Sequence, residues 1–577
     1  MKKIASMLLA GLTFMSVTSC TDADYDSKYA DPSTTQTVGV PQVFTGILYK
    51  GNVWMNLMYY RFYTECSTSG LFAGVVGDSN IKGRFMGAGE GRYNDRWKEF
   101  YDMVTQFRLL EYTYNNLSEA EKSSNLLFYH LGRTLIDAQL HEMLSLFGDV
   151  PFNGTGTLWM DGNYDEAKKR CVYDDDVELY KQILTELKET GDYLSGNMDQ
   201  VALVALNNQD YTLADGSVEK WRKYVNSLRL RIALHLSTNG DCTAEAHAAI
   251  KEILENPDKY PLIESNDDNM GIASDTQTDD FNYGKSISQA FLTGGTDGLG
   301  AVGATVLQVM NVPENGKLDE NTDPRLQAMY DPNPDTTYVA FDVHMSNAAI
   351  TRESDLKKQE YAQKGMPGAS YYCRVDSQTV SGYKQYEGNF NIQSIWLTAA
   401  EVSLSKAEAY LMGYGVAKNE AKAEEFFKKG VKESVDFYWN MKETSSLYKE
   451  GNDSYYGKRP LVRPDDSEVT AYIDKIWKAD QETICTQLWL NFGYLNPEAA
   501  WNVVRRTGYP LVTFAKDTQI SNYPTPPNRL PYVSDELTYN SQNCQDAIAK
   551  NYEESTGYYT NLFWAKKDYY NLITINQ

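Results

Sequence analysis

Two glutamates on one predicted helix come closest, by type and spacing, to a catalytic pair. Glu401 and Glu408 lie in the run LTAAEVSLSKAEAY, where they share a helix face two turns apart. Cleavage of a glycosidic bond needs two carboxyl groups about 5 to 9.5 Å apart. A helix rise of roughly 10.5 Å over seven residues is too long for a retaining pair and marginal for an inverting one. Because the chain has 78 acidic residues, chance pairs are expected. We therefore interpret both glutamates as solvated or packing side chains.

The other residue types that support catalysis show no catalytic spacing. The sequence contains no GxSxG nucleophile motif and no GxxxxGK[ST] phosphate loop. The histidines form neither an HExxH motif nor a pair at i and i+4, so a zinc hydrolase is not indicated: His130, His141, His235, His247 and His344. We expect a protein that is not an enzyme and that carries no cofactor.

An acidic run, Asp331-Pro332-Asn333-Pro334-Asp335, alternates oxygen-bearing side chains as a calcium loop does. Thr336 stands where such a loop needs glycine, and the two prolines stiffen the segment. We interpret the run as a loop, and the sequence assigns no metal. None of the seven cysteines lies in a CxxC pair, so a zinc ribbon or a dithiol redox site is not indicated; one or two disulfides remain open.

Aromatic side chains are the most abundant binding groups in the sequence, with 43 tyrosines and 10 tryptophans. An aromatic ring can pack on the apolar C–H face of a sugar, while a tyrosine hydroxyl takes a polar partner. Aromatics on helical stripes, such as Trp221 and Trp501, are expected in the core. Aromatics in predicted loops are the candidate ligand contacts: Phe72, Phe281, Tyr283, Tyr338, Phe341, Tyr371, Tyr372, Tyr383 and Tyr386.

The N-terminus is typical of an exported lipoprotein. Lys2 and Lys3 precede a mostly apolar run from Ile4 to Val17, so residues 1–19 are interpreted as a signal peptide. Cys20 follows small and β-branched residues, as in a bacterial lipobox, and is the predicted site of lipidation. The alternative is ordinary cleavage that leaves Cys20 as a thiol in the tail.

A flexible, lipidated tether is expected over residues 20–43. Asp22, Asp24 and Asp26 follow Cys20, and the segment from Pro32 onward is rich in Ser, Thr and Gln. The acidic stretch resembles a signal for display on the cell exterior, although it also fits a plain solvated tether. No later run is long and apolar enough to cross a bilayer, which takes roughly 20 residues.

Composition describes an ordinary globular chain, with 42% hydrophobic and 23% charged residues among 577. A formal net charge of -24 argues against nucleic acid as a partner, because phosphate binding needs a surplus of Lys and Arg. The same charge disfavours simple adhesion to anionic lipid.

Helical periodicity places two scaffold regions around a loop-rich region. In residues 44–256 and 394–510, apolar residues recur at helical spacing, as they do at Trp221, Tyr224 and Leu228. Residues 257–393 are rich in Asp, Asn, Gly, Thr and Pro, and this loop-rich region is where we expect the ligand site. Residues 511–577 are predicted to form a C-terminal strap with an extended proline-rich part. We treat 44–577 as one domain.

Six segments in a fixed order resemble the SusD/RagB family of Bacteroides-type outer-membrane lipoproteins, especially its second, SusD-like branch. They span most of the mature chain: FGDVPF (147–152), the acidic helix start of 173–187, KWRKYVNSLRLRIALHLS (220–237), LTAAEVSLSKAEAY (397–410), AAWNVVRRTGYP (499–510) and NRLPYVSDE (528–536). The resemblance implies a mostly α SusD-like fold, in which four degenerate tetratricopeptide-like helix pairs carry long ligand-binding loops.

The resemblance also implies a function. Members of this family cover a TonB-dependent SusC-like transporter of the outer membrane and capture glycans or oligosaccharides without cleaving them. We therefore expect a glycan ligand, a SusC-like partner and a lipid-anchored position on the cell exterior. Two alternatives remain: binding of a peptide or glycopeptide nutrient by the same mechanism, and a structural lipoprotein of the cell surface that binds no ligand.

Overall fold

Helices make up most of the structure, a computed structural model that describes residues 38–77, 79–86, 90–292, 300–382, 384, 386–448 and 463–575. The first half contains α3 (Val40–Met55), α4 (Tyr59–Ser67), α5 (Ser69–Phe72), α6 (Glu90–Asn115), α7 (Glu119–Phe147), α8 (Leu158–Asp161), α9 (Tyr164–Arg170), α10 (Asp176–Leu194), α11 (Gln200–Gln209), α12 (Val218–His235) and α13 (Thr243–Glu255). The second half contains α14 (Tyr283–Leu292), α15 (Ala304–Val309), α16 (Leu326–Met329), α17 (Asn347–Gln363), α18 (Ala399–Met412), α19 (Glu420–Glu443), α20 (Asp466–Ile476), α21 (Gln481–Phe492), α22 (Pro497–Thr507), α23 (Ser534–Tyr539) and α24 (Ser541–Asn551). The prediction of a mostly α-helical fold is confirmed.

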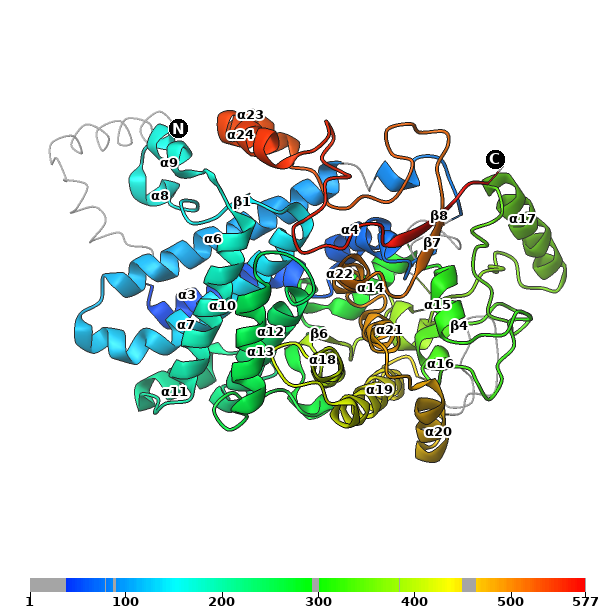
Figure 1. The fold of residues 1–577 in the computed structure, drawn as a ribbon, viewed down its shortest axis with the longest axis horizontal. Helices are drawn as coiled ribbons and strands as arrows, with labels where there is room; N and C mark the ends of the chain where they lie inside the picture. The colour runs from blue at the N-terminus through cyan, green and yellow to red at the C-terminus, as the bar shows by residue number, and fades with distance from the viewer. Residues whose placement is uncertain are drawn as a thin grey trace, which may run out of the picture.

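Neighbouring helices pack in pairs that form the scaffold. Close-packed pairs include α6 with α7, α10 with α12, α18 with α19 and α21 with α22. Figure 1 shows the long helices of the first half on one side of the molecule and α18 to α22 on the other. The two halves meet where α12 packs against α18 and α22.

The apolar stripe predicted on α12 lies in the core. Trp221, Tyr224 and Leu228 are almost fully buried, and the Trp221 indole Nε1 donates a hydrogen bond to Asp210 Oδ2 at 2.7 Å. The Ser217 side chain accepts a hydrogen bond from the Lys220 amide and caps the helix. The helix is therefore held in place by burial of its apolar face, and the indole N–H of Trp221 keeps a hydrogen-bond partner inside the core.

The helix predicted near residue 496 begins and ends as its sequence indicates. The Asn496 side chain accepts a hydrogen bond from the Ala499 amide, and Pro497 occupies the first turn. Gly508 ends the helix in the left-handed conformation at a φ of 80°, which a glycine adopts without strain.

The start of the folded body differs from the expectation. The flexible tether was expected to extend to residue 43, but α3 already begins at Val40. Val40 and Val43 are buried against the core, because the helix continues its apolar face four residues further toward the N-terminus. The predicted signal peptide and Cys20 lie outside the described residues.

Short antiparallel sheets and one long helix occupy the region predicted to be loop-rich. Strand β3 (Met270–Ala273) pairs with β6 (Gln393–Leu397), and β4 (Tyr330–Asp331) pairs with β5 (Arg374–Val375). Another antiparallel pair, β1 (Val150–Pro151) with β2 (Tyr173–Asp174), lies outside this region, in the first scaffold region. Helix α17 is a long helix within the region predicted to be loop-rich, and the Ser346 side chain caps its first turn. Figure 1 shows α17 at the edge of the molecule.

The C-terminal region is more ordered than an extended strap. Its proline-rich part has no helix or strand, as expected, but α23 and α24 follow it. Strand β8 (Tyr570–Ile573) then pairs in parallel with β7 (Val512–Ala515). The Tyr570 hydroxyl donates a hydrogen bond to the Phe72 carbonyl at 2.8 Å and accepts one from Trp501 Nε1 at 2.8 Å.

Candidate functional site

Four segments of the chain meet just before α15. The Gly77 amide donates to the Ala301 carbonyl at 2.9 Å, Ala301 forms an antiparallel bridge with Arg374, and the Cys373 amide donates to the Val339 carbonyl at 2.8 Å. A Cβ atom on Gly77 would lie 2.6 Å from the Val302 carbonyl oxygen, so only glycine permits this approach. Backbone pairing thus brings together segments that are distant in the sequence.

This pairing assembles an aromatic cluster, here called the 341/372 cluster: Ala301, Phe341, Ile350 and Tyr372, with Val339, Met345 and Tyr371 around them. The ring centroids of Phe341 and Tyr372 lie 4.1 Å apart, and those of Tyr371 and Tyr372 lie 5.2 Å apart. Phe341 and Tyr372 are buried, whereas Tyr371 is partly exposed. The Tyr371 ring is therefore the one a ligand can reach, and the two buried rings support it.

Charged groups of α17 hold the Tyr371 side of the cluster. The Lys357 ammonium lies 5.6 Å from the Tyr371 ring centroid. Asp335 accepts hydrogen bonds from the Tyr361 hydroxyl at 2.9 Å and from Lys364 at 3.3 Å. Burial acts to raise the pKa of Asp335, but these hydrogen bonds and the positive charge of Lys357 lower it below its usual value. The carboxylate is therefore ionised and engaged at neutral pH.

The acidic run at 331–335 is a structural turn. Asp331 accepts a hydrogen bond from the Ser377 amide, Asn333 accepts from the Thr337 amide, and Asp335 is held by α17. Its oxygens thus serve the protein's own donors and do not converge on a common point. Across the described ranges, no group of three His, Cys, Asp or Glu side chains is placed to hold a metal ion.

Several predicted contact residues lie in the core instead. Phe72 belongs to α5, where its ring packs 5.3 Å from the Trp501 ring centroid and is fully buried. Tyr283 is buried and donates a hydrogen bond from its hydroxyl to Asn52 Oδ1, and Tyr338 is also buried. The interpretation of Phe72 and Tyr283 as loop residues is wrong, because each belongs to a helix. Tyr338 lies in a loop as predicted, but its side chain is buried. In this structure a ligand does not reach their rings.

Two further predicted residues, Phe281 and Tyr386, do not belong to the 341/372 cluster. Phe281 is partly exposed and packs against Tyr49 and Tyr211, with ring centroids 6.3 and 5.5 Å apart. Tyr386 is exposed, with a φ of 73° that side chains rarely adopt. Tyr383 lies outside the described residues. The structure thus brings three of the nine candidates together, namely Phe341, Tyr371 and Tyr372.

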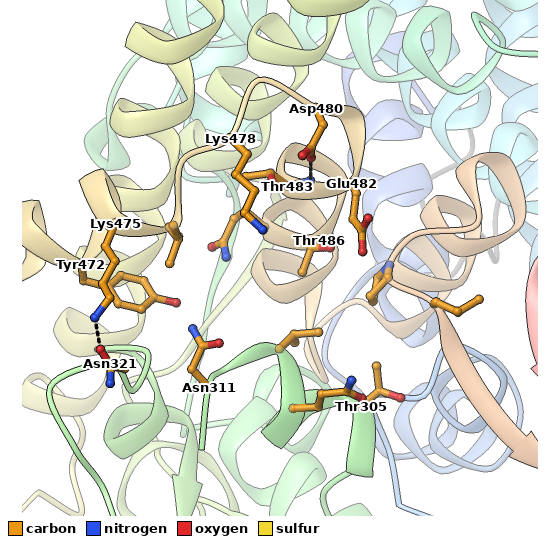
Figure 2. Close-up of a pocket in the computed structure, with 16 residues that line it drawn as sticks. Thr305, Asn311, Asn321, Tyr472, Lys475, Lys478, Asp480, Glu482, Thr483 and Thr486 are labelled. Carbon is orange, nitrogen blue, oxygen red and sulfur yellow. Dashed lines mark hydrogen bonds between the residues drawn. The ribbon is translucent and has the colours of Figure 1, made fainter. Parts of the chain in front are cut away.

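A polar pocket of about 490 Å³, lined in part by Thr305, Gln308 and Val309 of α15, was not predicted from the sequence. Figure 2 shows Lys478, Glu482 and Thr486 on one wall and Asn311 and Thr305 on the opposite wall. Its lining is rich in amide, hydroxyl and charged groups that can hydrogen-bond to a polyhydroxylated ligand. No local motif marks it, because α15, the loop after it, α20 and α21 each contribute only a few residues.

Two side chains fix the walls of this pocket. The Asp480 carboxylate accepts a hydrogen bond from the Thr483 amide at 2.8 Å and caps α21. The Lys475 ammonium, at the end of α20, donates to Asn321 Oδ1, as Figure 2 shows. The Tyr472 hydroxyl is engaged by Asp323, so this tyrosine shapes the pocket but has no free hydroxyl hydrogen for a ligand.

The two glutamates with near-catalytic spacing are structural. Glu401 accepts two hydrogen bonds from Arg231, and Glu408 accepts two from Arg506, both at 2.6 Å. All four side chains are largely buried, and each carboxylate faces a guanidinium group rather than a cavity shared by the pair. Their interpretation as packing residues is confirmed.

The fold and site define a class of protein: a scaffold of paired helices with an aromatic cluster on its connecting segments and a polar pocket between its helices. The sequence model of the SusD-like family, described as "Starch-binding associating with outer membrane", matches residues 79–533. The chain belongs to this family, so the resemblance seen in the sequence is confirmed.

Solved structures show the same fold. A SusD homologue from Bacteroides uniformis is 20% identical, with a TM-score of 0.61 over 92% of this chain and 100% of its own. A chitin-binding SusD homologue from Flavobacterium johnsoniae is 18% identical, with a TM-score of 0.60 over 90% and 98%. A SusD homologue from Bacteroides thetaiotaomicron is 19% identical, with a TM-score of 0.60 over 92% and 100%. No curated protein matches this chain.

The family is associated with the outer membrane. Among the helices in the described part of the chain, none combines the length and the apolar character that a bilayer crossing requires.

Proposed function

We propose that the protein binds a glycan or oligosaccharide beside α15 and delivers it to a SusC-like TonB-dependent transporter of the outer membrane. Membership of a starch-binding family supports this function, and so does the chitin-binding homologue of the same fold. The observation that carries the proposal is that the aromatic cluster and the polar pocket adjoin along the chain. Ala301 belongs to the 341/372 cluster, and Thr305, four residues later, lines the pocket of Figure 2.

The two features supply complementary parts of a carbohydrate site. The exposed part of Tyr371 offers an apolar ring for the C–H face of a sugar. The pocket offers hydroxyl and amide groups, among them Thr486 and Asn311, for the sugar hydroxyls. A volume of about 490 Å³ falls within the range usual for small-ligand sites. Two carboxyl groups line the pocket, Asp480 and Glu482, and the Asp480 carboxylate already accepts a hydrogen bond from the Thr483 amide. We propose binding without turnover.

A panel of glycans, with peptides and glycopeptides included, tests the binding function. Retention of a ligand without new reducing ends supports a binding protein, whereas new reducing ends would indicate an enzyme. Tyr371→Ala and Thr486→Val should weaken retention, while Tyr112→Ala, which removes an exposed ring on α6, should leave it unchanged. Retention of peptides alone would favour the peptide-nutrient alternative. Absence of any retained ligand would favour a structural lipoprotein.

The partner and the lipid anchor need a separate test. A lipid at Cys20 would hold the protein at the outer membrane, and a stable interface with a transporter would bury about 1,200 Å² or more. After mild detergent extraction, affinity capture should recover a large β-barrel protein in near-equal amount. Proteolysis of intact cells should then cleave the protein if it faces the exterior. Recovery of the protein alone in several detergents would contradict the partnership.

A further inference from the structure

A second cavity, of about 520 Å³, shares no lining residue with the pocket of Figure 2. It lies between α12, α13 and the segment after α13 on one side and α18 and α19 on the other. Figure 1 shows these helices next to one another. Part of its wall is apolar, formed by Ile253, Leu254, Pro257, Pro261 and Leu262. We call this cavity the Lys406 pocket.

Lys406 lines this pocket from α18, and its ammonium lies 3.8 Å from the ring centroid of Phe426 on α19. Within the described residues, the Lys406 ammonium has no carboxylate, carbonyl or hydroxyl oxygen at hydrogen-bond distance. The ring of Phe426 in turn stacks with Tyr410, which also lines the pocket. A half-buried cation thus rests on an aromatic face, with its three N–H donors free of protein acceptors.

The other cations of the pocket are already paired. The Arg222 guanidinium donates to Glu219 at 3.3 Å and to the Asp258 carbonyl. The Lys223 ammonium donates to both carboxylate oxygens of Asp268, at 2.9 and 3.0 Å. Lys406 is therefore the cation of this pocket with capacity for a ligand. A charge-assisted hydrogen bond to an anion is stronger than the contact with a ring that Lys406 now makes.

We propose that the Lys406 pocket binds an acidic sugar residue, carboxylated or sulfated, whose anionic group pairs with the Lys406 ammonium. The flexible lysine can turn from the Phe426 ring to the anion, which frees the ring for the C–H face of the sugar. The apolar wall covers the rest of that face. This inference rests on the proposed glycan-binding function and adds to it a class of ligand and a second point of contact.

The charge of Lys406 depends on pH in the range where binding is measured. Burial and the nearby Lys429 lower the pKa of Lys406 to about 8. Affinity for an acidic sugar should therefore fall as the pH rises through about 8, because the neutral amine no longer pairs with the anion. The charged groups around Lys406 are Lys429, Glu425 and Glu433 on α19, Glu264 and Asp258 after α13, and Glu219, Arg222 and Lys223 on α12.

Calorimetric titration of the full mature chain tests the inference with three probes: a galacturonate trisaccharide, a sulfated oligosaccharide and neutral maltotriose. Lys406→Gln should weaken binding of the acidic probe by about tenfold or more, and Lys406→Arg should largely retain it. Lys428→Gln is the matched control. Lys428 lies on α19 two residues after Phe426, but it pairs with Glu424 and Asp474 and does not line the pocket. Glu264→Gln removes an exposed negative charge that repels the anionic group of the sugar, so this variant should bind the acidic probe more tightly.

The outcomes separate this inference from the proposed function. If Lys406→Gln loses binding of the acidic probe and maltotriose binding is unaffected, the Lys406 pocket is supported. Whether the carboxylated or the sulfated probe binds to the wild type identifies the anion. Equal binding of the acidic probe by Lys406→Gln and the wild type would overturn it. So would binding that is lost only in Tyr371→Ala, which would place the acidic sugar on the 341/372 cluster. If no acidic probe binds but a neutral glycan does, the inference fails and the proposed function stands; if no glycan binds at all, both fail.

Discussion

The buried pair between Glu408 and Arg506 allows a quantitative test of the structural role assigned to the glutamates. Glu408→Leu removes the carboxylate and leaves the Arg506 guanidinium without its anion. The Glu408 side chain is fully buried and that of Arg506 is 3% exposed, so water cannot replace the lost partner. Breaking a buried pair by removing one partner costs about 3–5 kcal/mol of stability. Gln481, which also donates to Glu408 at 2.9 Å, loses its acceptor as well.

A double variant separates the cost of the orphaned charge from that of the altered packing. Glu408→Leu combined with Arg506→Met removes both charges, and such replacements are often neutral or stabilising. We therefore expect the double variant to unfold in urea at a concentration close to that of the wild type. The single variant should unfold at a much lower concentration, with a similar slope.

Equilibrium urea unfolding, followed by tryptophan fluorescence at pH 7, measures both variants. A loss below about 1 kcal/mol in the single variant would refute the reasoning, because the pair would then behave as an exposed salt bridge. A double variant as unstable as the single one would also refute it, since packing would then account for the effect. Retention of a bound glycan by the double variant would show that Glu408 has no part in binding.

Three further predictions follow from the burial of single groups and from the N-terminal sequence. Trp221→Ala should lower the free energy of unfolding by about 3–5 kcal/mol, because it empties a fully buried site. Tyr371→Ala should instead leave the thermal midpoint nearly unchanged and weaken ligand binding. Calorimetry measures the stability of both variants and the binding. Burial lowers the pKa of His130 to about 4, below the value near 6.5 of an unfolded chain. The stabilisation that neutral His130 gives above pH 6.5 is therefore lost as the pH falls toward 4. His130→Gln should show a smaller fall of the urea midpoint between pH 7 and pH 5 than the wild type does. Cys20→Ala should abolish partitioning into detergent, and a variant that stays as firmly membrane-bound as the wild type would contradict lipidation.

The sequence predicted elements well where local pattern and packing agree. The stripe around Trp221 and the cap at Asn496 each carry their signal within one helix, so periodicity and capping residues were sufficient. The aromatics at Phe72 and Tyr283 were misplaced, because their local sequence indicates a turn or loop while distant partners such as Trp501 enclose them. Tertiary packing overrode the local signal.

The two pockets could not be predicted for a related reason. The pocket of Figure 2 joins Asn311 to Lys478 across more than 160 residues of sequence, and no motif marks either residue. Lys406 lies within a helix of ordinary apolar periodicity, and a lysine in such a helix indicates a side chain exposed to solvent. Its contact with Phe426 and its lack of an oxygen partner within the described residues appear only when α18 and α19 are placed side by side.

The pairing of β8 with β7 sets a limit on when this protein can reach its native state. The Tyr570 hydroxyl bonds to the Phe72 carbonyl across 498 positions of sequence, and the Trp501 indole bonds to the same hydroxyl. During synthesis, this contact cannot form until Tyr570 has left the ribosome. Contacts over such separations also form slowly, because a long loop must close first. The native packing around Phe72 and Trp501 is therefore completed late in synthesis, after the helices between them have been made.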